Sequence, residues 1–291
     1  MDQFLQQLIN GLVLGSIYAL IAVGLSLIFG VIREMQWAHG EVYMIGAYAG
    51  YFMTVRLGLP YLASLCLAIL FSAILGIVME FLVFRPMRNF PKISTNLGAI
   101  GLSIFLLNAA NLLFSPEPQI FPVEYVNVSL QIGEVFITLQ RLIVFIVSFV
   151  LIISLSFFIK KTLIGKSMVA MSQDMQAASL MGIDVNFTAA LAFAVGSGLA
   201  GAAGVLISPI FLLYPQMSGI AVAKAFPVVV LGGLGSVEGA ILSGYLMGLA
   251  ESLTVGYVSS AYKDIPAFVI LILVLYLRPQ GLLGKKVMEK V

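Results

Sequence analysis

The only histidine of this chain lies two residues before an acid, in the stretch QWAHGEVYMIGAY. His39 and Glu41 could be an acid–base pair, half of a metal site, or the polar start of an apolar helix. A catalytic pair needs a nucleophile or a metal beside it, and a zinc site needs more ligands than one histidine and one glutamate. Two interpretations are favoured over catalysis. Glu41 is an acid in a first helical turn, where free backbone amides favour a carboxylate, or the two residues belong to a gate that reorganises.

A second stretch with chemical potential is GKS at Gly165–Ser167. A phosphate-binding loop needs a glycine five residues before Gly165, and it needs a strand before the loop. This chain has Lys160 at that position, and a long apolar run precedes it. We therefore expect no nucleotide site and no bound cofactor in this chain.

The composition indicates an all-α membrane protein with many spans. Of the 291 residues, 61% are hydrophobic and 10% are charged, and the mean hydropathy is +1.09, far from the mixture usual in soluble proteins. The net charge of +2 is small, and there is no basic run, which argues against a nucleic-acid partner. The single cysteine, Cys66, excludes a disulfide within the chain.

A helix needs about 20 apolar residues to cross the hydrocarbon core of a bilayer. The sequence predicts such spans near residues 8–31, 38–55, 60–83, 94–114, 139–159, 188–213, 236–258 and 265–282. A further apolar piece at Ser218–Leu231 has only 14 residues, which reach about 21 Å as a helix. Because Pro227 lies inside this piece, we expect a break there.

The basic residues orient these spans, because lysine and arginine gather in cytoplasmic loops. Two predicted loops are basic, through Arg85, Arg88, Lys92, Lys160, Lys161 and Lys166. Residues 115–138 between them carry only acidic charges, from Glu117, Glu124 and Glu134. This assignment places residues 115–138 and the N-terminus outside. The tail is basic as well, through Arg278, Lys285, Lys286 and Lys290.

A cytoplasmic tail and an external N-terminus require an odd number of crossings. We therefore predict nine, and Ser218 to about Leu231 is a short broken crossing that continues through the glycines after it. Irregular backbone is costly in lipid, so other helices must shield this crossing.

Small residues recur every four positions in several predicted spans. They are Gly11, Gly15 and Ala19; Gly46 and Gly50; Gly196, Ala200 and Gly204; and Gly244 and Gly248. This spacing lets helix backbones approach closely, which predicts a tight bundle. In the external loop 115–138, YVNVSLQI and VFITL flank Gly133 and Glu134, which predicts a small β-hairpin. The hairpin either receives a soluble partner or caps the bundle.

The segment 160–186 on the cytoplasmic side carries an apolar stripe at helical spacing. The stripe consists of Met168, Met171, Met175 and Leu180. Asp174 lies on another face, and Gly182 is a stop signal. We expect one short amphipathic helix that lies on the lipid surface or docks into a protein groove. Its polar face lacks the lysines of a lipid-bound helix, and methionines suit an adaptable protein contact, which favours docking.

Three separated motifs are recognisable in matching order: AHGEVYMIGAY, AASLMGIDV and KAFPVVVLGGLGSVEGAILSG. Together they resemble the permease subunits of branched-chain amino acid ABC importers, over nearly the whole chain. The resemblance implies one permease domain over residues 1–291, in a bacterial inner membrane. It also implies a second related permease, two ATPase subunits that use ATP and Mg, and a soluble substrate-binding protein.

The same resemblance implies a docking function for segment 160–186. Ala177, Ala178, Gly182 and Ile183 match the loop whose short helix docks into the ATPases. Two methionines of the stripe and the neighbouring Asp174 complete this surface. The residues expected to contact the ATPases are Met171, Asp174, Met175, Ala177, Ala178, Gly182 and Ile183. Urea permeases share a similar histidine–glycine–glutamate motif, so a urea or short-amide importer is the alternative. Urea permeases often carry a long N-terminal extension that this sequence lacks.

Polar residues within spans are candidates for a gate or for the substrate path, because charge there is expensive. They are His39, Glu41, Asn108, Asn111, Lys224 and Glu251. Lys224 either neutralises the field near a broken helix or meets a substrate carboxylate. Glu251 and the asparagines either join helices or line the path. We expect Glu80 and Glu238 to be solvated helix ends.

Two other classes of protein remain to be tested. A self-sufficient channel would conduct without ATP and would need no docking helix. An intramembrane enzyme built on His39 and Glu41 would form a product.

Overall fold

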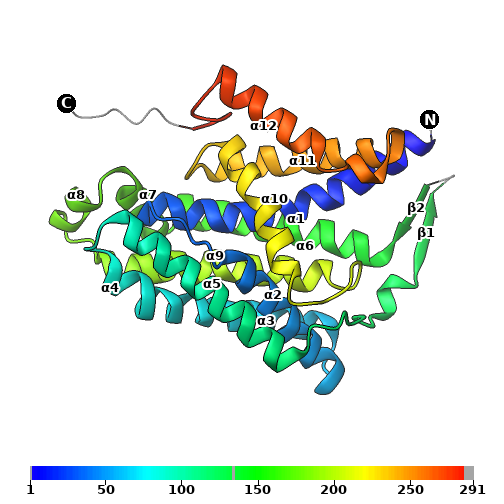
Figure 1. Cartoon of the computed structure of the whole chain (residues 1–291), viewed down its shortest axis with the longest axis horizontal. Coiled ribbons are helices and arrows are strands. Elements are labelled where there is room, and N and C mark those ends of the chain that lie inside the picture. The colour runs from blue at the N-terminus through cyan, green and yellow to red at the C-terminus, as the bar shows by residue number, and fades with distance from the viewer. Residues whose placement is uncertain (1, 133–134, 285–291) are drawn as a thin grey trace.

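The computed structural model describes residues 2–132 and 135–284, and it is almost entirely helical (Figure 1). The longer helices are α1 (Asp2–Ile32), α3 (Tyr61–Met79), α5 (Lys92–Phe114), α6 (Leu139–Lys161), α9 (Val185–Ile207) and α11 (Val237–Tyr257). The shorter ones are α2 (His39–Tyr51), α4 (Arg85–Met87), α7 (Leu163–Gln173), α8 (Met175–Leu180), α10 (Met217–Gly232) and α12 (Ile265–Leu277). A π-helical turn extends α2 over Phe52–Arg56, and another extends α3 over Glu80–Phe84.

Six helices of the described chain are long and apolar enough to cross a membrane, by length and composition alone. They cover Gln3–Ile32, Tyr61–Met87, Lys92–Phe114, Leu139–Lys161, Val185–Ile207 and Ser260–Leu277. All six overlap predicted spans. The two other predicted long spans are also helical, as α2 with its π-helical turn and as α11.

Local signals explain where several helices begin. Pro60 and Pro91 stand immediately before α3 and α5, where a missing N–H costs no helical hydrogen bond. The side chains of Thr138, Asp184 and Ser236 accept hydrogen bonds from backbone amides in the first turns of α6, α9 and α11. Such caps satisfy amide groups that have no partner within the helix.

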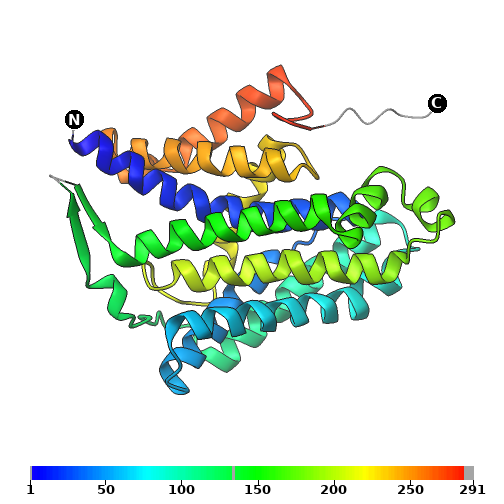
Figure 2. The same ribbon diagram turned by 180° about the vertical axis from the view of Figure 1, so that it is seen from behind.

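The two ends of the bundle differ. The N-terminus and the hairpin lie at one end, whereas α4, α7, α8 and the end of α12 lie at the other (Figures 1 and 2). The basic loops around α4 and α7 therefore share one end of the molecule. The acidic loop of residues 115–138 lies at the opposite end.

The hairpin pairs β1 (Ser129–Ile132) with β2 (Val135–Thr138) in antiparallel register, with Ser129 opposite Thr138. Its two strands agree with the prediction, whereas the expected turn residues Gly133 and Glu134 lie outside the described residues. The Gln6 side chain of α1 donates to the Phe136 carbonyl at 3.1 Å and accepts from its N–H at 3.0 Å. The hairpin is therefore attached to the bundle.

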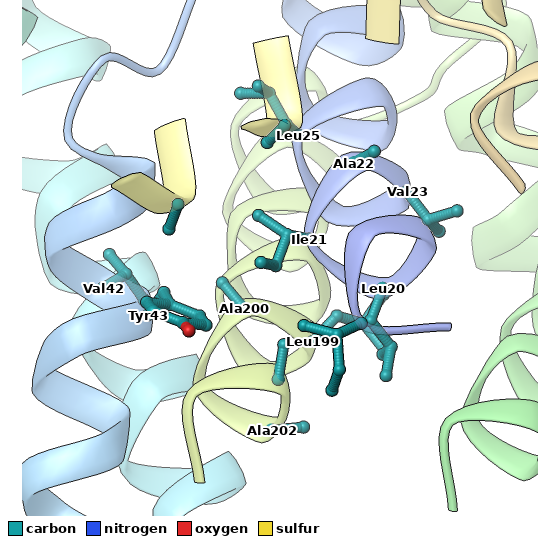
Figure 3. Close-up of a cluster of buried hydrophobic side chains, with 14 of the residues drawn as sticks. Leu20, Ile21, Ala22, Val23, Leu25, Val42, Tyr43, Leu199, Ala200 and Ala202 are labelled. Carbon is teal, nitrogen blue, oxygen red and sulfur yellow. The ribbon is translucent and has the colours of Figure 1, made fainter. Parts of the chain in front are cut away.

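The small-residue stripes do bring helix backbones together. A Cβ built on Gly15 would lie 2.8 Å from Cα of Tyr245, and one on Gly248 would lie 2.3 Å from N of Gly15. In the same way, a Cβ on Gly46 would lie 2.4 Å from Cα of Gly201. These distances confirm close packing of α1 on α11 and of α2 on α9. The apolar core that includes α1, α2 and α9 is shown in Figure 3.

The expected break at Pro227 is wrong, because α10 is one continuous helix from Met217 to Gly232 with Pro227 inside it. Proline removes one backbone donor, and packing against neighbouring helices maintains the rest of the helix. The glycines that follow Gly232 do not extend the helix itself. Gly233 and Gly235 have φ angles of +102° and +80° and form the turn into α11, a backbone shape that glycine adopts without strain. Figure 1 shows α10 inclined steeply across the long helices.

The chain after α12 returns to the end of α10. The N–H of Leu282 donates to the Leu231 carbonyl at 2.8 Å, and that of Leu283 donates to the Gly232 carbonyl at 3.0 Å. These bonds satisfy carbonyls in the last turn of α10 that have no partner within the helix. The remaining tail lysines lie outside the described residues.

Candidate functional site

Helix α2 begins inside the bundle, with His39 as its first residue. The His39 side chain is buried, and its Nε2 lies 3.1 Å from the carbonyl oxygen of Ile21, well within α1. Its Nδ1 lies 2.9 Å from Oε1 of Gln36, which is also buried. The segment after α1 therefore folds back between the helices before α2 starts. Hydropathy did not reveal this because residues 33–38 include Arg33, Glu34 and Gln36, a polar composition that is equally typical of a loop outside the bundle.

The hydrogen bonds of His39 define its chemistry. A carbonyl oxygen only accepts, so Nε2 of His39 carries a proton toward Ile21. Its other ring nitrogen, Nδ1, is then an acceptor, which requires the Gln36 amide to be turned so that its NH₂ group donates to the ring. With both nitrogens engaged, His39 is positioned to fix the backbone of the returning segment. Because both ring nitrogens are occupied by neighbouring groups, neither is free to bind a metal or to remove a proton from a substrate.

Glu41 lies where two helices start. Its side chain is 4% exposed, and Ser103 of α5 and Ser218 of α10 lie beside its carboxyl group. A Cβ on the preceding Gly40 would lie 2.3 Å from the Ser218 carbonyl oxygen, so the starts of α2 and α10 touch. Backbone amides at helix starts favour a carboxylate. Within the described chain, Oε2 of Glu41 has no hydrogen-bond partner.

An aromatic stack closes the space beside His39. The rings of Trp37 and Phe226 are stacked with their centroids 5.5 Å apart. A cavity of only ≈ 10 Å³, lined partly by Gln36 and His39, lies next to them. It is far too small for an amino acid, so this place is closed. The sequence analysis missed Trp37 and Phe226, although a lone tryptophan two residues before a lone histidine was a usable signal.

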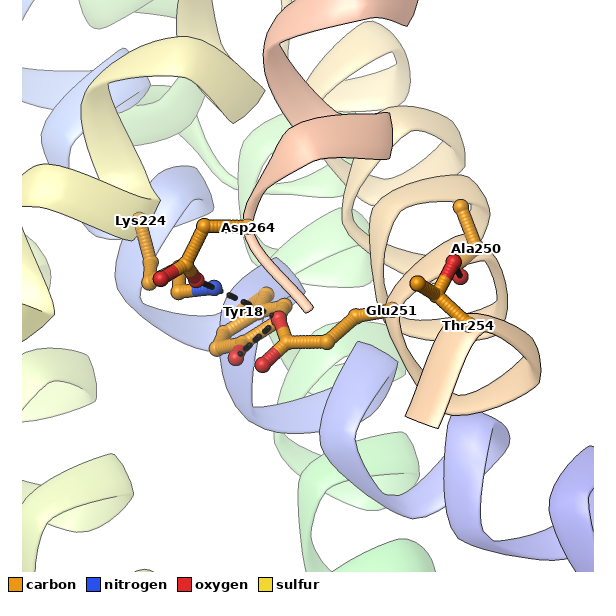
Figure 4. Close-up of polar contacts among 6 residues, drawn as sticks. All are labelled: Tyr18, Lys224, Ala250, Glu251, Thr254 and Asp264. Carbon is orange, nitrogen blue, oxygen red and sulfur yellow. Dashed lines mark hydrogen bonds and ion pairs between the residues drawn. The ribbon is translucent and has the colours of Figure 1, made fainter. Parts of the chain in front are cut away.

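Lys224 and Glu251 form an ion pair that the sequence analysis did not predict. Nζ of Lys224 on α10 lies 2.7 Å from Oε2 of Glu251 on α11, and their side chains are 13% and 8% exposed. Tyr18 of α1 donates its hydroxyl to the same oxygen at 2.8 Å. Asp264, just before α12, also pairs with Lys224 (Figure 4). The cluster joins α1, α10 and α11 to the start of α12.

The two asparagines have different surroundings. Nδ2 of Asn108 donates to the Ile104 carbonyl of its own helix, and the residue is exposed. Oδ1 of Asn111 accepts from Nε2 of Gln216 at 3.3 Å, just before α10. Asn111 thus joins α5 to the start of α10, whereas the Asn108 amide bonds within α5. The structure brings neither residue to His39 or to Lys224.

Segment 160–186 contains two short helices in place of the single one expected. Helix α7 ends at Gln173, and α8 begins at Met175. Between them, Asp174 has an extended backbone, and its carboxylate accepts from the N–H groups of Gln176 and Ala177 at 2.9 and 3.0 Å. An aspartate in this position starts a new helix, because it caps the free amides of the first turn.

Met171 is not an exposed docking residue, which corrects a second expectation. Its side chain is 1% exposed and belongs to the main apolar core, as does that of Met168. The apolar stripe on α7 therefore packs against this chain's own bundle. Leu180 and Met181 lie at the outer end of α8 and are 89% and 84% exposed.

Gly182 ends α8 as the sequence predicted. Its φ angle is +85°, and the N–H groups of Gly182 and Ile183 donate to the carbonyls of Ser179 and Ala178 at 3.0 and 3.1 Å. This pair of bonds is the Schellman pattern that glycine favours after a helix. Asp184 then caps α9, so the path of the chain past Leu180 is closely defined.

The two acids expected to be solvated helix ends differ. Glu238 is exposed and pairs with Lys160 at 2.9 Å. Glu80 is buried, and its Oε1 accepts from Nη2 of Arg88 at 2.6 Å. The expectation for Glu80 is wrong because the π-helical turn at its position directs it into the protein, where a charge requires a partner.

Comparison with known proteins identifies the family. Residues 7–275 match the family described as "Branched-chain amino acid transport system / permease component". This chain belongs to that family. The permease is 37% identical over 301 residues to the LivH permease protein of a high-affinity branched-chain amino acid transport system from Salmonella typhimurium, covering 99% of this chain and 98% of LivH. The corresponding BraD protein of Pseudomonas aeruginosa matches with the same identity and coverage.

More distant relatives agree with this assignment. The permease is 26% identical to LivM of Salmonella typhimurium, a second permease protein of the same named system, over 92% of this chain and 68% of LivM. In fold, it resembles the solved structure titled PsaBC from Streptococcus pneumoniae in complex with Fab. The TM-score is 0.50 at 15% sequence identity, covering 95% of this chain and 92% of that one.

The family assignment confirms the predicted class of protein. The chain is a multi-pass permease component of an ABC transport system, homologous to bacterial inner-membrane permeases. Permeases of this kind lack nucleotide-binding sites, in agreement with the interpretation of Gly165–Ser167. The existence of LivH-like and LivM-like permeases indicates a heteromeric complex.

Proposed function

We propose that this permease forms half of the translocation path of an ATP-driven importer for leucine, isoleucine and valine. The observation that carries the proposal is 37% identity, over essentially the full length, to permeases named for high-affinity branched-chain amino acid transport. The second half of the path belongs to a related LivM-like permease. The substrate passes between the two permeases, and a soluble binding protein delivers it.

Nine crossings form the proposed topology, with α10 and its flanking loops as the seventh. Helix α9 ends near the hairpin, where Gln119 and Leu213 pair, whereas α11 starts near Lys160 at the opposite end. The chain from 208 to 236 must therefore traverse the bundle once. The basic loops at the α7 end support a cytoplasmic location for that end. The N-terminus is then external, and the tail is inside.

This topology has a direct test by cysteine labelling. In a Cys66→Ala background, single cysteines at 127, 174 and 286 are exposed to a membrane-impermeant thiol reagent. Position 127 should react from outside, and positions 174 and 286 should react only after the membrane is opened. Labelling of position 286 from outside would require an even number of crossings. Position 286 lies outside the described residues, so this arm of the test is independent of the structure.

The ATPases bind at α8 in this proposal. The docking surface consists of Leu180 and Met181 together with the predicted residues Asp174, Met175, Ala177, Gly182 and Ile183. The predicted residue Ala178 is buried and holds α8 on the bundle. Exposed apolar side chains at the tip of a rigid, capped helix suit insertion into a groove. Met171 supports the segment from within the core. Two ATPase subunits, which use ATP and Mg, would serve the two permeases.

The candidate gate comprises His39, Glu41, Trp37 and Phe226. They lie around the start of α2, where Glu41 is beside the start of α10 and Trp37 stacks on Phe226 farther along α10, next to the closed cavity. Lys224 and Glu251 serve to join helices in this proposal, because their charges already compensate each other. Asn111 positions the start of α10, and Asn108 faces outward.

The decisive experiment is uptake by the reconstituted complex. The permease, its related partner, the ATPases and the binding protein are placed in liposomes with ATP inside, and leucine, isoleucine, valine and urea are supplied outside. ATP-dependent uptake of the three amino acids is the expected result. Urea uptake without leucine uptake would favour the urea importer, and flux through the lone chain without ATP would favour a channel.

A further inference from the structure

Arg33 adopts an unusual backbone conformation immediately after α1. Its φ angle is +55°, and among the described residues only Ser115 shares a positive φ without being glycine. A side chain with a Cβ resists this region, so surrounding contacts must maintain it. The Arg33 N–H still donates to the Phe29 carbonyl at 2.8 Å. The chain therefore turns sharply at Arg33 from α1 into the segment that folds back into the bundle.

The Arg33 side chain reaches the junction of α7 and α8. Its Nη2 lies 3.0 Å from the Ser172 carbonyl oxygen and 2.8 Å from the Gln173 carbonyl oxygen. These carbonyls are in the last turn of α7 and have no partner within the helix. A guanidinium there is favoured by both hydrogen bonds and the negative end of the helix. The next residue, Asp174, caps the start of α8.

The other end of the returning segment is fixed as well. Six residues after Arg33, His39 is held by Ile21 and Gln36, and α2 begins there. The connection between Arg33 and His39 is short and is held at both ends by hydrogen bonds. A displacement of Arg33 would therefore move the start of α2. A cleft of ≈ 260 Å³ lies between the end of α1 and the start of α8, lined by Val31, Arg33, Met171, Gln173, Asp174, Met175 and Gln176. The junction of α7 and α8 therefore borders this cleft and is also held by Arg33.

We propose that Arg33 is the positioning residue that couples the ATPase-docking segment to the start of α2. Movement of α8 displaces the Ser172 and Gln173 carbonyls, Arg33 follows them, and the segment 34–38 passes the displacement to His39. This inference rests on the proposed docking function of α8. It adds a mechanical link to the transport path that neither the resemblance nor the docking surface specifies.

Three substitutions separate the side chain from the backbone. Arg33→Gly tolerates the positive φ but removes both hydrogen bonds. Arg33→Gln removes the charge and shortens the side chain. Arg33→Lys keeps a cationic donor that can reach one carbonyl, although it lacks the planar guanidinium. Lys166→Gln is the matched control. It removes one exposed positive charge from α7, the helix whose last carbonyls Arg33 contacts, without touching those carbonyls.

Each variant is purified with the complete complex, and three quantities are measured: ATPase coelution, ATP hydrolysis, and leucine taken up per ATP hydrolysed. We expect Arg33→Gly and Arg33→Gln to retain their ATPases but to lose about five- to tenfold in uptake per ATP, the low end of coupling between sites. Arg33→Lys should recover part of this loss, and Lys166→Gln should match the unmodified complex.

The outcomes distinguish the inference from the proposed function. Normal uptake per ATP in both Arg33→Gly and Arg33→Gln would overturn the coupling function of Arg33 and leave the docking proposal intact. Loss of the ATPases in these variants would also overturn it, because Arg33 would then support docking itself. If the unmodified complex shows no ATP-dependent leucine uptake, the proposed function fails, and the coupling function of Arg33, which rests on it, fails with it.

Discussion

Lys224 and Glu251 compensate each other's charge inside the bundle, with 2.7 Å between Nζ and Oε2. They come from α10 and α11, and Asp264 adds a second, half-exposed acid to the same lysine. The net contribution of a buried ion pair to the free energy of unfolding is small. Removing only one partner costs much more, because it leaves an uncompensated charge inside the protein. The consequences of removing each partner are therefore unequal.

Lys224→Met should destabilise the permease by about 3–5 kcal/mol, because Glu251 is then left buried without its cation. Glu251→Gln should cost less, since Lys224 keeps Asp264 and Tyr18 can still bond the amide. The Lys224→Met, Glu251→Gln double variant should regain part of the loss. Thermal unfolding in detergent measures all three. Equal melting temperatures for Lys224→Met and Glu251→Gln would contradict this account.

The contact of α1 with α11 should tolerate no side chain at Gly248. A Cβ there would lie 2.3 Å from the backbone N of Gly15, so Gly248→Val must separate the helices. We expect a loss of about 1–3 kcal/mol or more, as for other overpacked sites. Gly101→Ala on α5 is the control, because nothing lies within 4 Å of its Cβ position. Unfolding in detergent and the yield of folded protein provide the measurement, and an unchanged Gly248→Val would refute close packing here.

Leu180 and Met181 should determine ATPase binding. Replacing both with glutamate adds charge to an apolar contact that excludes water, which should weaken docking by about 2 kcal/mol or more. The permease itself should stay folded, because both side chains are exposed. Leu163→Glu, an equally exposed leucine at the start of α7, is the control. Coelution of ATPases that is unaffected by the double variant would exclude this surface.

Gly182 should matter through its backbone. Gly182→Val places a β-branched residue at a φ angle of +85°, at a cost of roughly 1 kcal/mol or more. Nothing lies within 4 Å of its Cβ position, so steric clash is not the cause. Gly182→Asn should be milder, because asparagine tolerates this conformation. Substrate-stimulated ATP hydrolysis should fall in the order glycine, asparagine, valine, and the reverse order for the two variants would disprove the backbone explanation.

The Trp37–Phe226 stack should prevent leakage. Trp37→Ala removes the larger ring beside a cavity of only ≈ 10 Å³, and we expect leucine to escape from loaded liposomes without ATP. Trp37→Phe keeps an aromatic ring and should remain tight. Efflux of preloaded leucine from the complex is the readout. A complex that stays tight with Trp37→Ala would move the gate elsewhere in the path.

Local features of the sequence determined much of this protein. Gly182, Asp184 and Ser236 mark helix ends through backbone preference and capping, which depend on near neighbours. The spans, the small-residue stripes and the hairpin strands also follow from short-range periodicity. The three motifs established the family, because their order and spacing are properties of the chain itself.

Tertiary structure decided which face of each helix meets protein. In a membrane, an apolar face suits lipid and a neighbouring helix equally well, so hydropathy could not show that Met171 is buried and Leu180 is exposed. It also could not show that Lys224 meets Glu251, that α2 begins beside Ile21, or that Arg33 reaches the end of α7. Each of these contacts joins residues distant in sequence, and only the packing of whole helices brings them together.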